Sequence, residues 1–271
     1  MTDWLTVARG DAPLIVSIPH TGMEIPGDVT GLVSMTDARH DADHSIDRLY
    51  GFASDLGATV VRTAVSRTVI DVNRDPSGTS LYPGQATTGL CPETTFAGVP
   101  LYLPAAGPDD VEIGRRRTAW FDPYHAAIRA EISRLRALHA TVVVYDAHSI
   151  LSHVPRLFDG ELPQFNIGTF DGASCDPALT SAVAAACAGD SQVINGRFKG
   201  GWITRHHGDP ANGVHAIQME LAMRGYLDEG APWPPEWDVG RAAALQGVLR
   251  QVLSAVLGFA RSHNRDGATP R

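Results

Sequence analysis

The chain has 271 residues, 44% of them hydrophobic, and a formal net charge of −8 at pH 7. This length and composition can bury one large α/β core, or less readily two small ones. Lys199 is the only lysine and no extended basic run appears, so we expect no nucleic-acid partner, which would need a clustered positive face.

The cysteines and the opening residues bear on the cellular compartment. The three cysteines, Cys91, Cys175 and Cys187, form no C-x-x-C pair, and an odd, scattered set fits a reducing cytosol better than a disulfide framework. The opening MTDWLTVARGDAP lacks the basic start and apolar core of a signal peptide. No apolar run approaches the roughly 18 residues that span a bilayer. We therefore expect a cytoplasmic protein with no membrane partner.

The first part of the chain carries short predicted strands around one helix. Pro13 to Ile18 is typical of a strand, and apolar residues at helical spacing predict a helix over 43–56. Two β-rich runs follow at 58–63 and 67–73. Residues 75–108 are rich in Gly, Pro and Thr without a clear period, and so long a loop in a compact domain is more often functional than idle.

The second part carries longer elements. Apolar spacing predicts a long helix over 109–138, whose acidic first turn suits the helix dipole. The continuous apolar run at 141–149 predicts a buried, parallel strand. A helix at 178–187, a strand at 213–221 and a closing helix at 239–261 complete the pattern.

The order of these elements predicts the fold. Strands that alternate with helices are typical of an α/β sandwich of three layers around a mixed, mostly parallel sheet, and we expect residues 1–271 to form one such domain. In these sheets ligands bind beyond the carboxyl ends of the strands. The search for a functional site therefore starts at those ends.

Polar side chains collect at four predicted strand ends. His20 follows the first strand, residues 71–74 close the 67–73 run, and Asp146, His148 and Glu220 lie at the ends of two later strands. Two neutral imidazoles and one carboxylate are a common ligand set for catalytic zinc, which leaves the fourth position to water. Asp146 shares a strand face with His148 and could orient its imidazole. The alternative is a buried polar network without a metal.

Seven stretches of the sequence resemble the N-formylglutamate amidohydrolase family, the bacterial enzymes of histidine breakdown. They are SIPHTG (17–22), DADHSIDRLYGFASDLGAT (41–59), SRTVIDVNRDPSGTSLYPG (66–84), TGLCPETTFAGVPLY (88–102), YDAHSI (145–150), NGRFKGGWITRHHG (195–208) and GVHAIQMELAMR (213–224). That family in turn resembles the zinc carboxypeptidases and aspartoacylases in fold and site layout.

The resemblance implies an activity and a cofactor. It implies a zinc-carboxypeptidase-like fold and hydrolysis of N-formyl-L-glutamate, a small dicarboxylate, to formate and L-glutamate. The cofactor would be Zn²⁺ or another divalent transition metal, with His20 and His148 as ligands. At the third ligand this chain departs from the carboxypeptidase plan, which has a carboxylate three residues after the first histidine, where this chain has Met23. Glu24 comes one position late.

The segment 41–47 offers two other carboxylates for the third ligand. The formylglutamate family resembles this chain more closely there, and Asp43 is our first choice, followed by Asp47 and then Glu24. On a helix Asp43 and Asp47 would share one face at i,i+4 spacing. One could then bind the metal while the other pairs with an arginine.

The remaining roles also follow the resemblance. Glu220 is expected to take a proton from the attacking water and pass it to the leaving nitrogen. Arg67 is expected to stabilise the tetrahedral oxyanion. Asn73 and Arg74 are candidates for the first substrate carboxylate and Arg205 for the second, because a guanidinium binds a carboxylate through two parallel hydrogen bonds.

Several nearby residues have weaker claims. His206 and His207 are interpreted as the rim of the pocket rather than as metal ligands, and Lys199 as a possible assistant to the arginines. Tyr82 and the 75–108 loop are candidates for a segment that closes over the substrate.

Two other functions stay open at this point. One is the same zinc-dependent chemistry on another N-acyl amino acid or a small peptide. The other is a non-catalytic protein that binds a metal or a carboxylate, although such a protein has no use for a base at Glu220.

Overall fold

The computed structural model describes residues 4–266, and seven of its strands form one mixed sheet. Their order across the sheet is β1, β3, β2, β4, β7, β5, β6. Their bounds are β1 (Leu5–Ala8), β2 (Leu14–Ile18), β3 (Thr59–Thr63), β4 (Val142–Ile150), β5 (Phe165–Gly168), β6 (Gln192–Ile194) and β7 (Val214–Ala222). Among these strands the pairs β1–β3 and β5–β7 are antiparallel and the other neighbours are parallel. The predicted mixed, mostly parallel sheet is confirmed.

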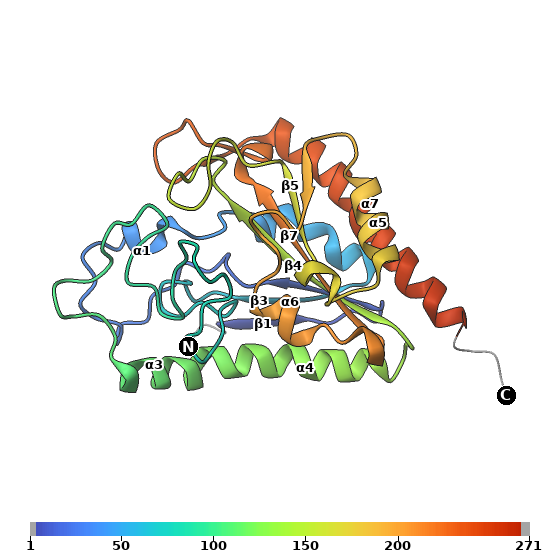
Figure 1. The fold of residues 1–271 in the computed structure, drawn as a ribbon, viewed down its shortest axis with the longest axis horizontal. Coiled ribbons are helices and arrows are strands. Elements are labelled where there is room, and N and C mark those ends of the chain that lie inside the picture. Colours follow the sequence, from blue (N-terminus) through green and yellow to red (C-terminus); the bar gives the residue numbers. More distant parts are fainter. Residues whose placement is uncertain (1–3, 267–271) are drawn as a thin grey trace.

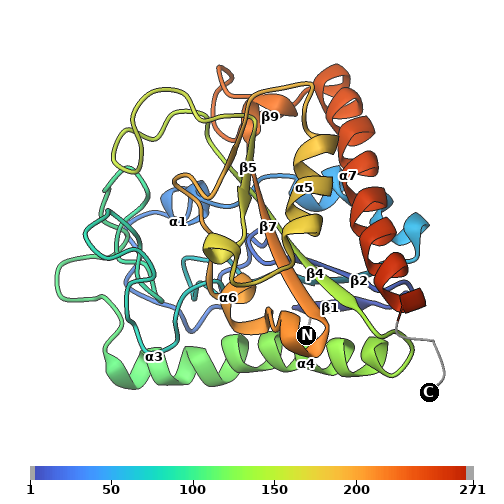
Figure 2. The ribbon, with the colours of Figure 1, turned by 45° about the vertical axis from the view of Figure 1, so that its right-hand side comes forward.

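Helices cover both faces of the sheet, as Figure 1 and Figure 2 show. On one face lie α3 (Asp110–Arg116), α4 (Asp122–Arg136) and the short α6 (Trp202–His207), and on the other lie α5 (Pro177–Ala186) and α7 (Val239–Asp266). The remaining elements are α1 (Asp37–His40), α2 (Ile46–Leu49) and a small hairpin of β8 (Leu227–Asp228) and β9 (Glu236–Trp237). This is the predicted three-layer arrangement.

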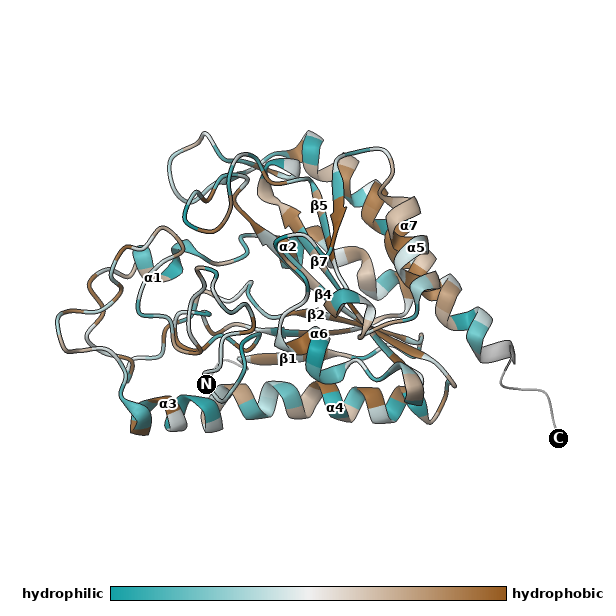
Figure 3. Cartoon of the chain, in the orientation of Figure 1, coloured by the Kyte–Doolittle hydropathy of each residue, from teal (hydrophilic) through white to brown (hydrophobic). Residues whose placement is uncertain are grey.

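The central strands send alternate residues to two different cores. In β4, Val143, Tyr145 and Ala147 pack on the side of α5 and α7, whereas Val142 and Val144 pack on the side of α4. Figure 3 shows the apolar colour concentrated along these central strands. On the α4 side the later residues of β4 and β7 are polar, so this face of the sheet changes from apolar to polar toward the carboxyl ends.

The strand predicted at 67–73 is wrong, because this segment folds into turns. The amide of Val69 donates to the carbonyl of Ser66, and the amide of Asn73 donates to the carboxylate of Asp71. Local bonds of this kind, especially from side chain to backbone, offer the chain an alternative to a strand ladder.

Two predicted helices are present in altered form. The helix predicted over 43–56 is broken into α2 and a 3-10 helix (Gly51–Leu56), so that Asp43 precedes it. The helix predicted over 109–138 consists of α3 and α4 joined by a π-helical turn (Arg117–Phe121). The strands β1, β5 and β6 were not predicted, because three or four residues carry too short a pattern.

Helix α7 is long and apolar enough, by length and composition alone, to cross a membrane over Val239–His263. In the structure it packs beside α5 and buries Leu249, Val252 and Val256 completely. Its place against the sheet accounts for its apolar character.

Two buried histidines connect the helices of the α4 face to the 66–74 turns. Nε2 of His125 on α4 donates to the carbonyl of Val72 at 2.8 Å, so its Nδ1 accepts from Nε2 of His207 on α6 at 2.9 Å. Both imidazoles are therefore neutral. Burial lowers the pKa of His125 to about 3 and that of His207 to about 2.

The histidine pair predicts a loss of stability in mild acid. Unfolded histidine takes up a proton below about pH 6.5, whereas the folded pair stays neutral until about pH 3, so the free energy of unfolding falls as the pH drops below 6.5. Each group contributes at most about 1.4 kcal/mol per pH unit. Urea unfolding of wild type and His207→Gln between pH 7.5 and 4.5 should show a smaller pH slope in the variant. Equal slopes would contradict this role.

Candidate active site

The strand ends bring His20, His148 and Glu220 to one edge of the sheet. His20 follows β2, and His148 lies in the neighbouring strand β4, which pairs in parallel with β2. The register of β4 and β7 sets Glu220 directly beside His148. Asp43 joins them from the segment between α1 and α2, where its amide donates to the carbonyl of His20 at 2.9 Å.

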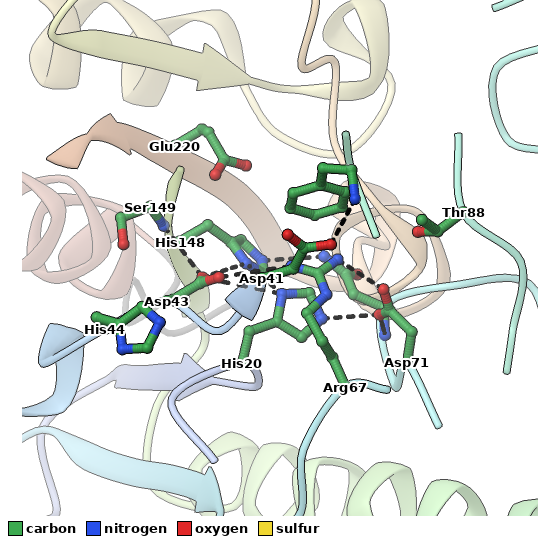
Figure 4. Close-up of polar contacts among 12 residues, drawn as sticks. His20, Asp41, Asp43, His44, Arg67, Asp71, Thr88, His148, Ser149 and Glu220 are labelled. Atoms are coloured by element: carbon green, nitrogen blue, oxygen red, sulfur yellow. Dashed lines mark hydrogen bonds and ion pairs between the residues drawn. The ribbon is translucent and has the colours of Figure 1, made fainter. Parts of the chain in front are cut away.

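His20, Asp43 and His148 form a buried triad whose ligand atoms face one another (Figure 4). The Nδ1 atoms of the two histidines lie 3.1 Å apart. Asp43 Oδ2 lies 3.3 Å from Nδ1 of His148 and 3.8 Å from Nδ1 of His20. Asp43 is thus the carboxylate that the structure brings to both histidines.

Each histidine of the triad contacts a further carboxylate through its other nitrogen. Nε2 of His20 lies 2.7 Å from Asp71 Oδ1, and Nε2 of His148 lies 2.9 Å from Asp146 Oδ2. Because a carboxylate only accepts, each Nε2 carries the proton and donates it. Carboxylate partners of this kind orient metal-binding imidazoles. The contact between Asp146 and His148 agrees with the expectation from the sequence.

This arrangement directs two imidazole nitrogens and one carboxylate oxygen at one point. With both Nε2 atoms engaged by carboxylates, Nδ1 of each ring faces Asp43 Oδ2, which also accepts from the amide of Ser149 at 3.0 Å. These three atoms lie within 3.8 Å of one another, a grouping that needs positive charge between them, either a proton on Nδ1 of His148 or a metal cation. A divalent cation with nitrogen and oxygen ligands satisfies all three, so the residues fit a metal.

The pKa shifts of the two histidines agree with a site that attracts positive charge. Burial lowers the pKa of His148, but the carboxylates of Asp146 and Asp43 outweigh it and hold the pKa well above its ordinary value. Burial, and then Arg67, lower the pKa of His20 and keep that imidazole neutral.

Asp71 is the centre of a network that the sequence reasoning missed. Besides His20, it accepts from Nη2 of Arg67 at 2.7 Å and lies 3.7 Å from Nη1 of Arg74. Burial would raise the pKa of Asp71, but Arg67 and Arg74 hold it well below its usual range. Arg67 also approaches Asp43 Oδ1 at 3.5 Å, so its guanidinium lies next to the triad.

Asn73 serves this network rather than an open binding surface. Its Oδ1 accepts from the amide of Ile203 at 2.7 Å, which directs its Nδ2 toward Asp146 Oδ2 at 3.1 Å. Nε2 of His148 lies 2.9 Å from this Nδ2, and both nitrogens are donors that share the carboxylate of Asp146. Asn73 lines the cavity, but these contacts occupy both ends of its amide.

A narrow cavity of about 50 Å³ opens beside the triad and receives Glu220. The Glu220 side chain is buried, and its Oε2 accepts from Nε2 of Gln218 at 3.4 Å. Burial raises the pKa of Glu220 to about 8. His20, Arg67 and His148 line the same cavity, so the predicted base, oxyanion donor and histidine ligands meet there.

Two arginines line this cavity beyond Arg67, and one of them was not predicted. Arg74 donates to the carbonyl and hydroxyl of Thr88 at 3.0 and 3.1 Å. Arg197 donates to the carbonyls of Leu157 and Ala86, and no carboxylate lies within ion-pair distance of it among the described residues. Burial lowers its pKa, which reflects a cation without a balancing charge.

Arg205 does not line the cavity. Its Nε donates to the carbonyl of Gly200 at 2.8 Å, and its guanidinium stacks on Tyr82 and Phe170. The sequence predicted Arg205 as the cation from the segment 195–205, whereas the structure has Arg197 in the lining of this cavity. Because the segment is rich in glycine and lacks a period, its sequence could not separate Arg197 from Arg205.

The other candidates lie outside the triad. Asp47 accepts from Arg62 at 2.8 Å. Of the two aspartates Asp43 and Asp47, it is therefore Asp47 that pairs with an exposed arginine outside the triad. Glu24 pairs through its backbone with Val65 and lines a different surface pocket. Lys199 pairs with an exposed aspartate at 3.1 Å.

Tyr82 lies at the cavity, whereas His206 and His207 make their contacts elsewhere. Tyr82 lines it and donates to the carbonyl of Gly200 at 3.0 Å, which ties the 75–108 loop to the segment before α6. His206 stacks on Trp202, and His207 pairs with His125, so neither belongs to the triad.

Comparison with known proteins places this site in a family. The family model for N-formylglutamate amidohydrolase matches residues 12–227. The chain is 47% identical over 259 residues to an N-formylglutamate deformylase of Pseudomonas putida, with 94% of this chain and 96% of that protein covered. It is 46% identical over 265 residues to one of Pseudomonas aeruginosa, with 96% and 98% covered.

Solved structures agree in fold. The crystal structure of an N-formylglutamate amidohydrolase from Ralstonia eutropha JMP134 superposes with a TM-score of 0.77 at 25% identity, with 97% of this chain and 99% of that chain covered. The gene product Atu2144 of Agrobacterium tumefaciens superposes with a TM-score of 0.70 at 20% identity, with 97% and 95% covered, and shows the shared fold.

The triad predicts which carboxylate holds the metal. Asp43→Asn should lose most of its bound divalent metal, because a neutral amide replaces the charged ligand atom that faces both histidines. Asp47→Asn is the matched control and should keep a full equivalent, since Asp47 pairs with Arg62 instead. Metal content per chain, measured by mass spectrometry after gel filtration, decides between them. Loss in the Asp47 variant alone would overturn the assignment.

Proposed function

The chain belongs to the N-formylglutamate amidohydrolase family, and on that premise we propose that it hydrolyses N-formyl-L-glutamate to formate and L-glutamate. The observation that carries the proposal is the buried triad with Glu220 beside it in one cavity. We propose that His20, Asp43 and His148 hold Zn²⁺ or another divalent transition metal. Two imidazoles and one carboxylate are a ligand set that suits such ions.

Proton transfer falls to Glu220. When bound, a divalent cation would supply positive charge that lowers the pKa of a water toward about 7 and polarises the amide carbonyl. Glu220 accepts the proton of the attacking water and later delivers it to the amide nitrogen as the bond from carbon to nitrogen breaks. Its buried position favours the protonated form, which suits the delivery to a poor leaving group.

Arg67 is proposed to stabilise the charge that develops on the carbonyl oxygen. Its guanidinium lies next to Asp43 and is held by Asp71, so it needs no reorganisation during the reaction. Burial of this ion pair keeps solvent from screening it.

The two carboxylates of the substrate require two further cations. Arg74, which lies nearest the catalytic network through Asp71, is proposed to bind the α-carboxylate next to the scissile amide. Arg197, which lies in the cavity without an ion-pair partner, is proposed to bind the side-chain carboxylate in place of Arg205. Asn73 then contributes by donating to Asp146, the carboxylate that orients His148.

The wider expectations from the sequence complete the proposal. We propose that residues 1–271 act as one catalytic domain in the cytoplasm on a small dicarboxylate. Hydrolysis of another N-acyl amino acid stays the main alternative, because the acyl side of the cavity and not the metal site decides between these substrates.

A turnover assay tests the proposed function and the base together. Wild type should release formate from N-formyl-L-glutamate and lose this activity with a chelator. Glu220→Gln should retain metal and bind product, while kcat falls by roughly 10²–10⁴ because the amide cannot accept a proton. No formate from metal-loaded wild type would refute the function. Near-normal kcat in the variant would refute the role of Glu220.

The proposed carboxylate site predicts a preference that one arginine controls. Wild type should hydrolyse N-formylglutamate with a much higher kcat/KM than N-formylglutamine, since removal of one partner from a desolvated charge pair costs about 2–5 kcal/mol. Arg197→Gln should lose most of that preference. Arg205→Gln is the control and should keep it, because Arg205 lies outside the cavity lining. If only the Arg205 variant loses the preference, Arg197 is misassigned.

A further inference from the structure

A second cavity of about 290 Å³ lies next to the active-site cavity and has no role in the proposed reaction. We name it the acyl-side cavity. Its wall includes the aliphatic side chains of Ala42, Ile150, Leu151, Val154, Pro155 and Met223, and its polar members are His40, Asp41, Ser149, His153 and Arg156. Its volume approaches the lower limit of about 300 Å³ for small-molecule sites, and its lining suits an apolar group.

Phe96 and Ile150 line both cavities and so form the wall between them. The amide of Phe96 donates to Oδ2 of Asp41 at 2.5 Å. Asp41 precedes the triad carboxylate Asp43 by two residues. The ring of Phe96 lies against the guanidinium of Arg67, 4.7 Å from its centre. Both the backbone and the ring of Phe96 therefore contact residues next to the triad.

The proposed carboxylate positions in the active-site cavity indicate which end of the substrate would meet this wall. Arg74 and Arg197 hold the segment 86–88, on the side proposed for the two carboxylates. The acyl carbon must lie between the triad and Arg67, where the oxyanion develops. Because the ring of Phe96 lies against Arg67 and forms part of the wall shared with the acyl-side cavity, a substituent on an acyl carbon held there would face this ring.

We propose that Phe96 restricts the acyl group to formyl, and that the acyl-side cavity binds longer aliphatic acyl groups once this ring is removed. The inference rests on the proposed function and adds the residue that selects the acyl group. The reaction is unchanged, since water adds its oxygen to the acyl carbon, the bond from carbon to nitrogen breaks, and the proton goes to the nitrogen. A hydrogen on the acyl carbon fits against the ring, whereas an alkyl chain needs the space behind it.

The test compares N-butyryl-L-glutamate with N-formyl-L-glutamate as substrates of metal-loaded wild type, Phe96→Ala and Phe198→Ala. Phe96→Ala should raise the ratio of kcat/KM for butyryl over formyl by at least about 10-fold, the discrimination that a pocket achieves for one methylene. Phe198→Ala is the matched control, because Phe198 lines the active-site cavity but not the acyl-side cavity. It should leave the ratio within a few-fold of wild type.

Two further variants separate a cavity effect from damage to Arg67. Phe96→Leu removes the ring from Arg67 but keeps a bulky wall, so it should lower both rates without the rise in ratio. Adding Val154→Phe to Phe96→Ala fills the acyl-side cavity and should reverse the gain. A ratio that does not rise in Phe96→Ala, or that rises equally in Phe96→Leu or Phe198→Ala, would overturn the proposal.

Binding supplies a readout that does not depend on turnover. If Phe96→Ala is inactive on both compounds, calorimetric titration should still show tighter binding of the butyryl compound relative to the formyl compound than in wild type. An unchanged ratio of affinities would overturn the proposal. Failure of wild type to release formate refutes the proposed function instead, and the binding ratio remains a separate measure of the wall.

Discussion

Two imidazole nitrogens and one carboxylate oxygen that face one another at close range impose the main constraint on this structure. Nδ1 of His20, Nδ1 of His148 and Oδ2 of Asp43 lie within 3.8 Å of one another in a buried place. Their close approach requires positive charge between them and groups that hold the side chains in position. The buried carboxylates of Asp71 and Asp146 fix the rings, and Arg67 and Asn73 in turn stabilise those carboxylates.

Strand geometry explains why part of this site could be predicted from the sequence. His20, His148 and Glu220 come at or just after the ends of neighbouring parallel strands, and such ends meet at one edge of a sheet. The apolar run of β4 is long enough to make its own prediction secure. The assignment of Asp43 depended on the family resemblance. Asp43 lies in an irregular segment, where residue spacing does not reveal the direction of a side chain.

The residues that the sequence could not assign lie in segments whose residue pattern does not reveal the direction of the side chains. The 67–73 run has the composition of a strand, but it folds into turns. These turns bring Asp71 to its partners, so its contacts could not be predicted from a strand. Arg197 and Arg205 are eight positions apart in one glycine-rich segment, and only the packing of α6 separates their environments. Phe96 lies in the long loop 75–108, where no period exists to show which side chains are turned inward.

Asp71 has a consequence for the energetics of the whole site. Its carboxylate lies 2.7 Å from the imidazole of His20, 2.7 Å from the guanidinium of Arg67 and 3.7 Å from that of Arg74. An anion that binds Arg74 draws positive charge away from Asp71, which leaves more of the charge of Asp71 to act on His20 and makes its Nδ1 a stronger ligand. With the proposed roles of the triad and of Arg74, occupancy of the metal and of the dicarboxylate would be thermodynamically linked, and each would change the affinity of the other by the same factor. A cell that accumulates the product would, by this linkage, protect the enzyme from losing its metal.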